Sequence, residues 1–333
     1  MTVSLTRIVL FLLASSVMPA ETKYGVRYLL VVDKTGNTLS FVDPETLEEV
    51  ATVPVGQEPH EVIVSRDGRR AYVSNYGGRN PGNTVSIIDI EARKNVGQID
   101  LGENRAPHGL DLSPDGKLLY VTCEGAQTLV TIRLPEEKLD SACKTNQKIS
   151  HMVAVTPDGR KAYVPNIGSK SVTVIDTKSN KVLTHIPVEV QPEGIDISPD
   201  GKEVWVGNRR TGSISVIDTE RDEVLDTLEC EGFPIRVKFS PSGDKVLVSC
   251  AEVGKVAIFD PKTRKETGRI AVGALPIGIV LSPDGSVAFV ANGRDKTISV
   301  VDLEKSKVTG LVSVGKNPDG LAIVPDRDKR KSY

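Results

Sequence analysis

The sequence is poor in aromatic residues, in net charge and in the short motifs of common enzymes. Aromatic side chains make up 4% of the 333 residues, and Trp205 is the only tryptophan. The formal net charge is −2, so the overall balance does not favour nucleic acid or an anionic membrane as a partner. The motifs CxxCH, GxSxG, paired CxxC and a glycine-rich phosphate loop are missing. Covalent haem, a serine nucleophile elbow and a paired-cysteine zinc site are therefore disfavoured.

Long apolar runs are also missing from the start of the chain, where only residues 8–13 form a short one. This run is too short to span a bilayer. Arg7 precedes it and small residues follow at positions 14–20, which is the pattern of an export signal. We expect a cleaved signal peptide over residues 1–20, a mature chain that begins near Glu21, and a periplasmic or secreted protein without a membrane span.

What the chain does have is a repeat. A turn of the type Ser-Pro-Asp-Gly begins at seven positions: Ser65, Ser113, Thr156, Ser198, Ser240, Ser282 and, in degraded form, Val324. The steps between them are 48, 43, 42, 42, 42 and 42 residues. A nearly fixed period of this length, filled with short alternating strands, is typical of a radial β-repeat.

Each repeat predicts four strands, with a tight hairpin between the first two. The chain starts inside a repeat, because residues 28–55 hold strands two to four without a first strand. Residues 320–324 form a first strand with nothing after it. We therefore predict an all-β protein with one domain over residues 21–333, a seven-bladed β-propeller of four-stranded blades. The C-terminal strand should close the ring by pairing with residues 28–32.

The second strands carry a recognisable signature, LYVTC at Leu119 and AYVSN at Ala71. With the period and the turns, they resemble the YVTN β-propeller repeat family over about residues 26–326. The resemblance implies an exported seven-bladed propeller and is specific for fold rather than for activity. The Gly-His and Trp-Asp signature of the rival WD repeats is absent.

Candidate functional residues stand where the copies differ. The residue that opens each first strand, usually after a proline, runs around the ring as His60, His108, His151, Glu193, Ile235, Ile277 and Asp319. First strands are innermost in a propeller, so these side chains begin at the mouth of the central channel. Imidazoles with flanking carboxylates are suitable ligands for zinc, copper or iron. We predict one divalent transition metal held by His60, His108, His151 and Glu193.

Two other interpretations of the histidines stay open. The rings can be bonded to neighbouring backbone at a polar channel mouth, or can bind an anion or transfer protons without a metal. Further binding candidates come from the same end of the ring, on long loops or at the channel: Asp319, Arg105, Arg79, Arg236 and Glu61. Arg236 either holds an anion or pairs with Glu231 or Glu252.

Two functions from different classes remain. The first is a module that binds an unknown small molecule or protein partner through its histidine-bearing face. The second is a metal-dependent enzyme of oxidoreductase, lyase or lactonase type at the same place. A propeller fold does not decide between them.

The even number of cysteines in an exported chain permits disulfides. Cys123 and Cys250 lie in blades across the ring from each other, and a strand separates Cys143 from Cys123. Cys230 takes a valine position of the repeat, one blade before Cys250. We expect free, buried thiols.

Overall fold

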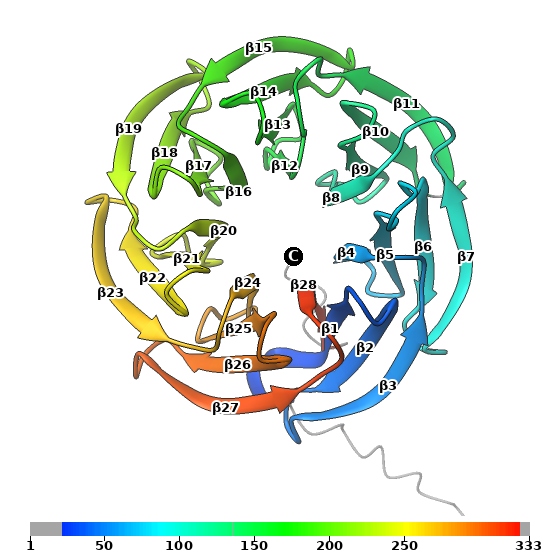
Figure 1. Ribbon diagram of the computed structural model, residues 1–333, viewed down its shortest axis with the longest axis vertical. Helices are drawn as coiled ribbons and strands as arrows, with labels where there is room; N and C mark the ends of the chain where they lie inside the picture. Colours follow the sequence, from blue (N-terminus) through cyan, green and yellow to red (C-terminus); the bar gives the residue numbers. More distant parts are fainter. Residues whose placement is uncertain (1–21, 135, 327–333) are drawn as a thin grey trace, which may run out of the picture.

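The computed structural model describes residues 22–134 and 136–326, and these form a ring of seven four-stranded antiparallel sheets around a central channel (Figure 1). The predicted seven-bladed propeller is confirmed. The predicted signal segment, residues 1–20, lies outside the described residues. In the described part of the chain, no helix is long and apolar enough to cross a membrane. The one helical turn there is η1 (Lys23–Gly25).

The strands take four positions from the channel outward. The innermost are β28 (Pro318–Pro325), β4 (Pro59–Val64), β8 (Pro107–Leu112), β12 (Ala154–Val155), β16 (Pro192–Ile197), β20 (Pro234–Phe239) and β24 (Pro276–Leu281). The second strands are β1 (Val26–Asp33), β5 (Arg70–Asn75), β9 (Leu118–Cys123), β13 (Lys161–Asn166), β17 (Glu203–Asn208), β21 (Val246–Cys250) and β25 (Val287–Asn292). The third strands are β2 (Thr38–Asp43), β6 (Thr84–Asp89), β10 (Thr128–Arg133), β14 (Ser171–Asp176), β18 (Ser213–Asp218), β22 (Lys255–Asp260) and β26 (Thr297–Asp302). The outer strands are β3 (Glu48–Pro54), β7 (Lys94–Asp100), β11 (Lys138–Lys144), β15 (Lys181–Pro187), β19 (Glu223–Glu229), β23 (Lys265–Ala271) and β27 (Lys307–Ser313).

The Ser-Pro-Asp-Gly turn holds the first two strands of a blade together by side-chain bonds as well as by its shape. Ser198 donates from its hydroxyl to Asp200 at 2.7 Å and accepts the backbone N–H of Glu203 at 3.0 Å. Gly201 closes the turn at φ +73°, a conformation that residues with a Cβ rarely adopt. The expectation of a tight hairpin at each copy is confirmed at this one.

The core lies between neighbouring blades, because the second and third strands are apolar on both faces. Trp205 on β17 is fully buried and meets Phe239 and Phe259 of the next blade edge-on, with ring centroids 5.8 and 6.1 Å apart. Edge-to-face contacts of this kind add to the free energy gained by burial. Each blade thus depends on both neighbours for its hydrophobic contacts.

The ring is closed by the two ends of the chain. Strand β28 pairs antiparallel with β1 in the register Tyr28 to Val324 and Val31 to Leu321. The predicted closure is confirmed, and β1 has no open edge toward the channel.

An asparagine at the end of the second strand ties the incoming link to its blade. Asn75 accepts the backbone N–H of Gly56 at 2.9 Å and donates to Ser86 of the third strand at 3.0 Å. Asn292 accepts the backbone N–H of Gly273 at 2.9 Å in the same way. Each of these asparagines thus holds the link that precedes its blade.

Candidate functional site

The residues that open the first strands meet in one pocket at the channel mouth. Its volume is about 300 Å³. Its walls include six of the sequence-predicted positions: His60, His108, His151, Glu193, Arg236 and Asp319. The sequence therefore predicted which repeat position lines the pocket, while the function of these residues stays a prediction.

The three histidines are stacked along one wall. The ring centroid of His108 lies 4.6 Å from that of His60 and 3.8 Å from that of His151. The three histidines differ in their local backbone structure. His60 and His108 belong to regular strands, whereas His151 precedes the short strand β12. Proline opens the other first strands, but Ser150 occupies that place here. The stacking confirms that neighbouring blades bring these side chains together.

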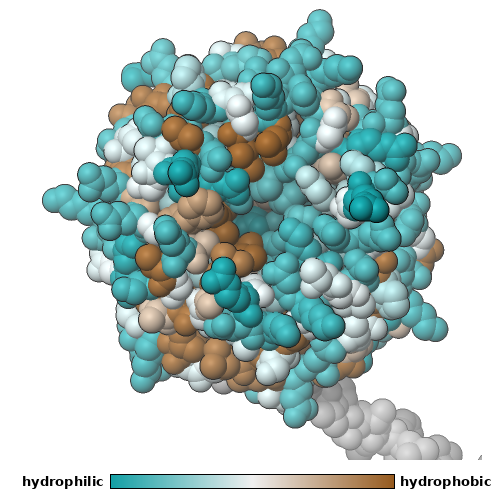
Figure 2. Space-filling model, viewed as in Figure 1, coloured by the Kyte–Doolittle hydropathy of each residue, from teal (hydrophilic) through white to brown (hydrophobic). Residues whose placement is uncertain are grey.

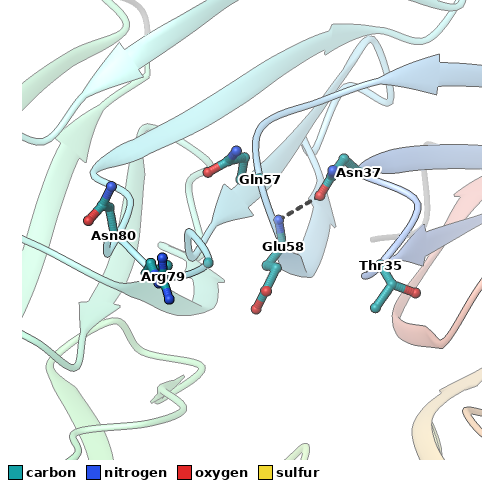
Figure 3. Close-up of a pocket in the computed structure, with 7 residues that line it drawn as sticks. Thr35, Asn37, Gln57, Glu58, Arg79 and Asn80 are labelled. Atoms are coloured by element: carbon teal, nitrogen blue, oxygen red, sulfur yellow. Dashed lines mark hydrogen bonds between the residues drawn. The ribbon is translucent and has the colours of Figure 1, made fainter.

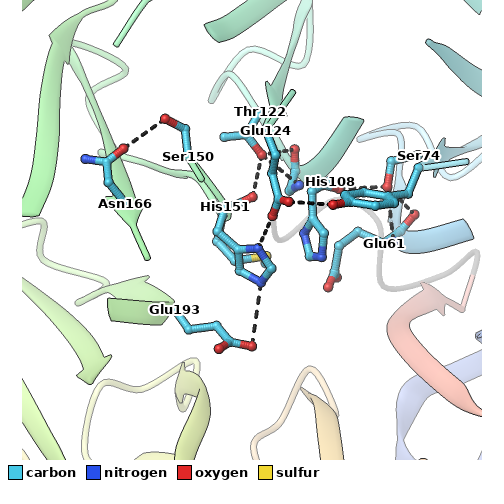
Figure 4. Close-up of polar contacts among 12 residues, drawn as sticks. Glu61, Ser74, His108, Thr122, Glu124, Ser150, His151, Asn166 and Glu193 are labelled. Atoms are coloured by element: carbon cyan, nitrogen blue, oxygen red, sulfur yellow. Dashed lines mark hydrogen bonds and ion pairs between the residues drawn. The ribbon is translucent and has the colours of Figure 1, made fainter. Parts of the chain in front are cut away.

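His151 is held between two carboxylates (Figure 4). Its Nδ1 contacts Glu124 at hydrogen-bonding distance, and its Nε2 lies 3.6 Å from Glu193. Tyr76 donates its hydroxyl to the other oxygen of Glu124 at 2.7 Å, and Arg209 pairs with Glu193 at 2.5 Å. Five groups thus form a continuous chain of polar contacts beside the stacked histidines.

Burial and these contacts give the three histidines different charges. Burial lowers the pKa of His60 to about 4, and the positive charge of Lys34 adds to this effect. Burial, together with the neighbouring His151 and His60, holds the pKa of His108 well below its usual value. Burial also opposes charge on His151, but the bonds with Glu124 and Glu193 outweigh it and raise its pKa to about 9. Near neutral pH, His60 and His108 are therefore neutral and able to bind a metal, and His151 is a cation.

Four important residues of this site were missed by sequence reasoning: Lys34, Tyr76, Glu124 and Arg209. All four are the first residue after a second strand, so they share a single repeat position. Comparison of this position around the ring would have shown that it varies, but not which of its side chains reach the histidines.

The opposite wall of the pocket is apolar. It consists of Phe233, Ile235, Ala251, Leu275 and Ile277. The face of the ring in Figure 2 is hollowed at its centre, with hydrophobic residues along one side of the hollow and hydrophilic residues along the other. A pocket with one polar and one apolar wall suits a small organic molecule that has a polar end.

Arg236 and Glu61 form a buried ion pair across the channel, from β20 to β4. Their side chains are 8% and 9% exposed. Arg236 also contacts the sulfur of Met152 at 3.6 Å, while its Nε has no hydrogen-bond partner among the described residues. The structural alternative expected for Arg236, a pair with Glu231 or Glu252, is wrong, because a partner from a distant blade lies directly across the narrow channel.

Arg79 and Arg105 do not line the histidine pocket. Arg79 borders a separate surface pocket of about 330 Å³ with Thr35, Gln57 and Glu58 (Figure 3). Arg105 is exposed, and its backbone lies against Gly125. The long loops that carry these arginines therefore extend over other parts of the face, and a binding role for either arginine stays a prediction.

His108, Glu124 and His151 form a group that can hold a metal ion. One donor atom from each lies within 4.8 Å of the other two. The Nδ1 atom of His108 is buried and has no hydrogen-bond partner among the described residues. Buried polar groups are normally paired, so this atom is available to a ligand. His60 and Glu193, the other two predicted ligands, lie beside this group, in contact with His108 and His151 respectively.

Beyond the Arg236–Glu61 pair, the channel continues as a second compartment of about 490 Å³ that contains Asp111. Burial raises the pKa of Asp111 to about 6, and the negative charge of Asp196 adds to the rise. Hydrogen bonds from the backbone N–H groups of Val155 and Leu112 and the positive charge of Lys238 oppose it, but they are outweighed. A carboxyl with a raised folded-state pKa stabilises the fold below about pH 3.8, and this contribution is lost as the pH rises through 6.

We therefore expect Asp111→Asn to gain stability relative to the natural chain as the pH rises. The difference in free energy of unfolding should move by roughly 2.4 kcal/mol in favour of the variant between pH 4 and pH 7, since one pKa unit is worth about 1.4 kcal/mol and the unfolded carboxyl is already partly ionised at pH 4. Urea unfolding of both proteins across this range measures it. A difference that stays constant with pH would contradict the assignment.

Comparisons with known proteins agree on the fold. Residues 21–115 match the family described as YNCE-like beta-propeller, and residues 145–279 match the family described as cytochrome D1 heme domain. Each match spans less than half of the chain. No curated protein matches the sequence. The chain is a seven-bladed β-propeller. The YNCE-like match supports the propeller class implied by the YVTN resemblance, although it does not carry that name.

Two solved structures show the same architecture over most of the chain. A chain of hydrazine synthase from Kuenenia stuttgartiensis is 22% identical, with a TM-score of 0.74, over 88% of this chain and 99% of that one. A functionally unknown protein from Desulfotomaculum acetoxidans is 16% identical, with a TM-score of 0.78, over 89% and 98%. At these identities the likeness concerns the fold alone.

Proposed function

We propose that this protein is an exported binding module whose histidine pocket takes a small organic molecule through one divalent transition metal. The observation that carries the proposal is the close group of His108, Glu124 and His151, in which one donor atom of each lies within 4.8 Å of the others and His108 has a buried nitrogen without a partner. Two imidazoles and a carboxylate suit zinc, copper or iron. These residues would move inward to bond a metal, because ligand bonds to zinc are about 2.0–2.2 Å long. His151 would also release a proton, because both of its nitrogens face carboxylates and only a neutral imidazole can bind a metal.

The surroundings of the three donors favour ligand binding over a purely structural metal. The apolar wall with Ile235 and Ile277 contains no further metal ligand, so a coordination position would face the open part of the pocket. Tyr76 and Glu193 would orient Glu124 and His151 from behind, in the way that outer hydrogen bonds fix metal ligands. The 300 Å³ volume is at the small end of the range of about 300–1,000 Å³ for organic ligands. A haem, which the name of one matching family mentions, does not suit a pocket of this size.

A metal-dependent enzyme is the second candidate, and the chain of polar contacts favours it. Arg209, Glu193, His151, Glu124 and Tyr76 link the pocket wall to groups that can hold or pass a proton. Turnover of a pocket-sized substrate that requires the metal and is lost in Tyr76→Phe would favour the enzyme. Metal-dependent binding without turnover would favour the module.

The metal is tested by thermal unfolding of the full mature chain, purified without a histidine tag and stripped with a chelator. Added Zn²⁺, Cu²⁺ or Fe²⁺ should raise the melting temperature, because a ligand at a hundred times its dissociation constant stabilises the folded state by about 2.7 kcal/mol. His108→Ala should abolish this rise and leave the apo protein folded.

The matched control is His185→Ala. His185 is the fourth histidine of the chain and lies exposed on the outer strand β15. The metal-induced rise should persist in this variant. An equal rise in His108→Ala and in the natural chain would refute the metal site and leave a metal-free ligand pocket.

A further inference from the structure

Cys230 and Cys250 lie side by side in the structure, although they come from different blades. Their sulfur atoms are 3.8 Å apart, and both side chains are fully buried. Cys230 follows β19 and begins the link into the next blade, and Cys250 ends the second strand of that blade. The sequence interpretation placed Cys230 in a fourth strand, whereas β19 ends one residue before it. It did not predict the contact with Cys250, which arises because the link folds back over the blade into which it leads.

The equivalent positions in other blades show how the connecting segment is normally held to the end of the second strand. The residue four before the opening proline is Val272 in the following blade, and the second strand there ends in Asn292, which binds the link through Gly273. Cys230 stands at the position of the valine, and Cys250 stands at the position of the asparagine. A thiol is a weak acceptor and does not replace the amide oxygen in this tie. The blade that lost the hydrogen-bonded tie therefore has two sulfur atoms at the same place.

We propose that Cys230 and Cys250 form a disulfide that links the two blades when the chain folds in an oxidising compartment. The sulfur atoms must approach from 3.8 Å to a bond length of about 2.05 Å. The link runs close over Cys250, because Gly232, two residues after Cys230, has no side chain and lies beside the Cβ of Cys250. A protein or glutathione disulfide serves as the oxidant.

The reaction is an ordinary double exchange. The Cys230 thiolate attacks the glutathione disulfide and releases one glutathione thiolate, and the Cys250 thiolate then attacks the Cys230 sulfur and releases the second. Two protein thiols are oxidised and one glutathione disulfide is reduced to two thiols, which take up the two protons. Because both thiols are buried in the finished fold, the exchange takes place before the two blades close on each other.

The bridge would hold one wall of the histidine pocket. Phe233, Ile235 and Arg236 lie in the chain between the two cysteines, and all three line that pocket. A bridge over this segment restricts the unfolded chain and stabilises the fold. This inference is independent of the proposed metal.

The test is a thiol count on full mature chain folded with a glutathione redox couple, alkylated after denaturation and mapped by mass spectrometry. Cys123 and Cys143 should be alkylated, and the peptides with Cys230 and Cys250 should be joined, with two hydrogens fewer. A reductant during folding should lower the melting temperature by roughly 5 °C. The double variant Cys230→Val/Cys250→Asn, which rebuilds the junction of the following blade, should lose this sensitivity, and Cys123→Ser should keep it.

Several results would overturn the proposal. One is four alkylated cysteines in protein folded under oxidising conditions, and another is a bridge that involves Cys123 or Cys143. A third is protection of Cys230 and Cys250 that a chelator reverses, because this would show a soft metal between the sulfur atoms.

Discussion

A chain truncated after Asn317 is expected to lose its cooperative fold. The truncation removes β28, whose Leu321, Ala322 and Val324 are buried against β1 and the neighbouring blades. Burial of one large aliphatic side chain is worth about 1.5–3 kcal/mol, and the whole stability of a domain is about 5–15 kcal/mol. The loss of these side chains together with the ladder to β1 therefore approaches the total. An unpaired β1 would also expose a strand edge to aggregation.

Trp205 reports this unfolding by fluorescence, since it is fully buried between two blades. The control is truncation after Asp326, which keeps every described contact of β28 and should melt like the full chain. A synthetic peptide of residues 318–326, added in excess to the shorter protein, should restore part of the transition. Unchanged melting of the chain that ends at Asn317 would contradict the closure as a source of stability.

Substitution of Arg236 by methionine is expected to destabilise the protein by roughly 3–5 kcal/mol, the cost of leaving one member of a buried ion pair without its partner. Glu61 would then be a buried carboxylate without the cation that pairs with it. The melting temperature should fall by about 5–8 °C. Chemical unfolding of the purified variant measures the loss.

The double variant Arg236→Met/Glu61→Gln distinguishes charge from shape. It keeps the side-chain volumes but removes both charges, and it should recover most of the lost stability. Equal destabilisation in the single and double variants would mean that the guanidinium acts through packing, not through its pair with Glu61.

The sequence predicted the fold and one of the two repeat positions whose side chains form the site. A period near 42 residues fixes which strands are innermost, and hence that His60, His108 and His151 come together. It does not fix how far a side chain reaches across the channel. The pair of Glu61 and Arg236 joins residues 175 positions apart, and its formation depends on the channel width and on side-chain conformation.

Glu124 shows a second limit of sequence reasoning. Its repeat position also holds Ile167, Ala251 and Gly293, so the position has no chemical character that repeats around the ring. Only the stacking of neighbouring blades puts its carboxylate against the ring of His151. The contact between Cys230 and Cys250 was missed for a related reason. The repeat shows which blade a connecting segment leads into, but it does not show the path of that segment over the blade.

The ion pair between Arg236 and Glu61 also has a consequence for the passage of small molecules along the central channel. Arg236 and Met152 line both the histidine pocket and the second compartment of the channel, so these two side chains lie at the boundary between the two cavities. A molecule that passes from one compartment to the other would have to pass these two side chains, and Arg236 is held in place there by its pair with Glu61.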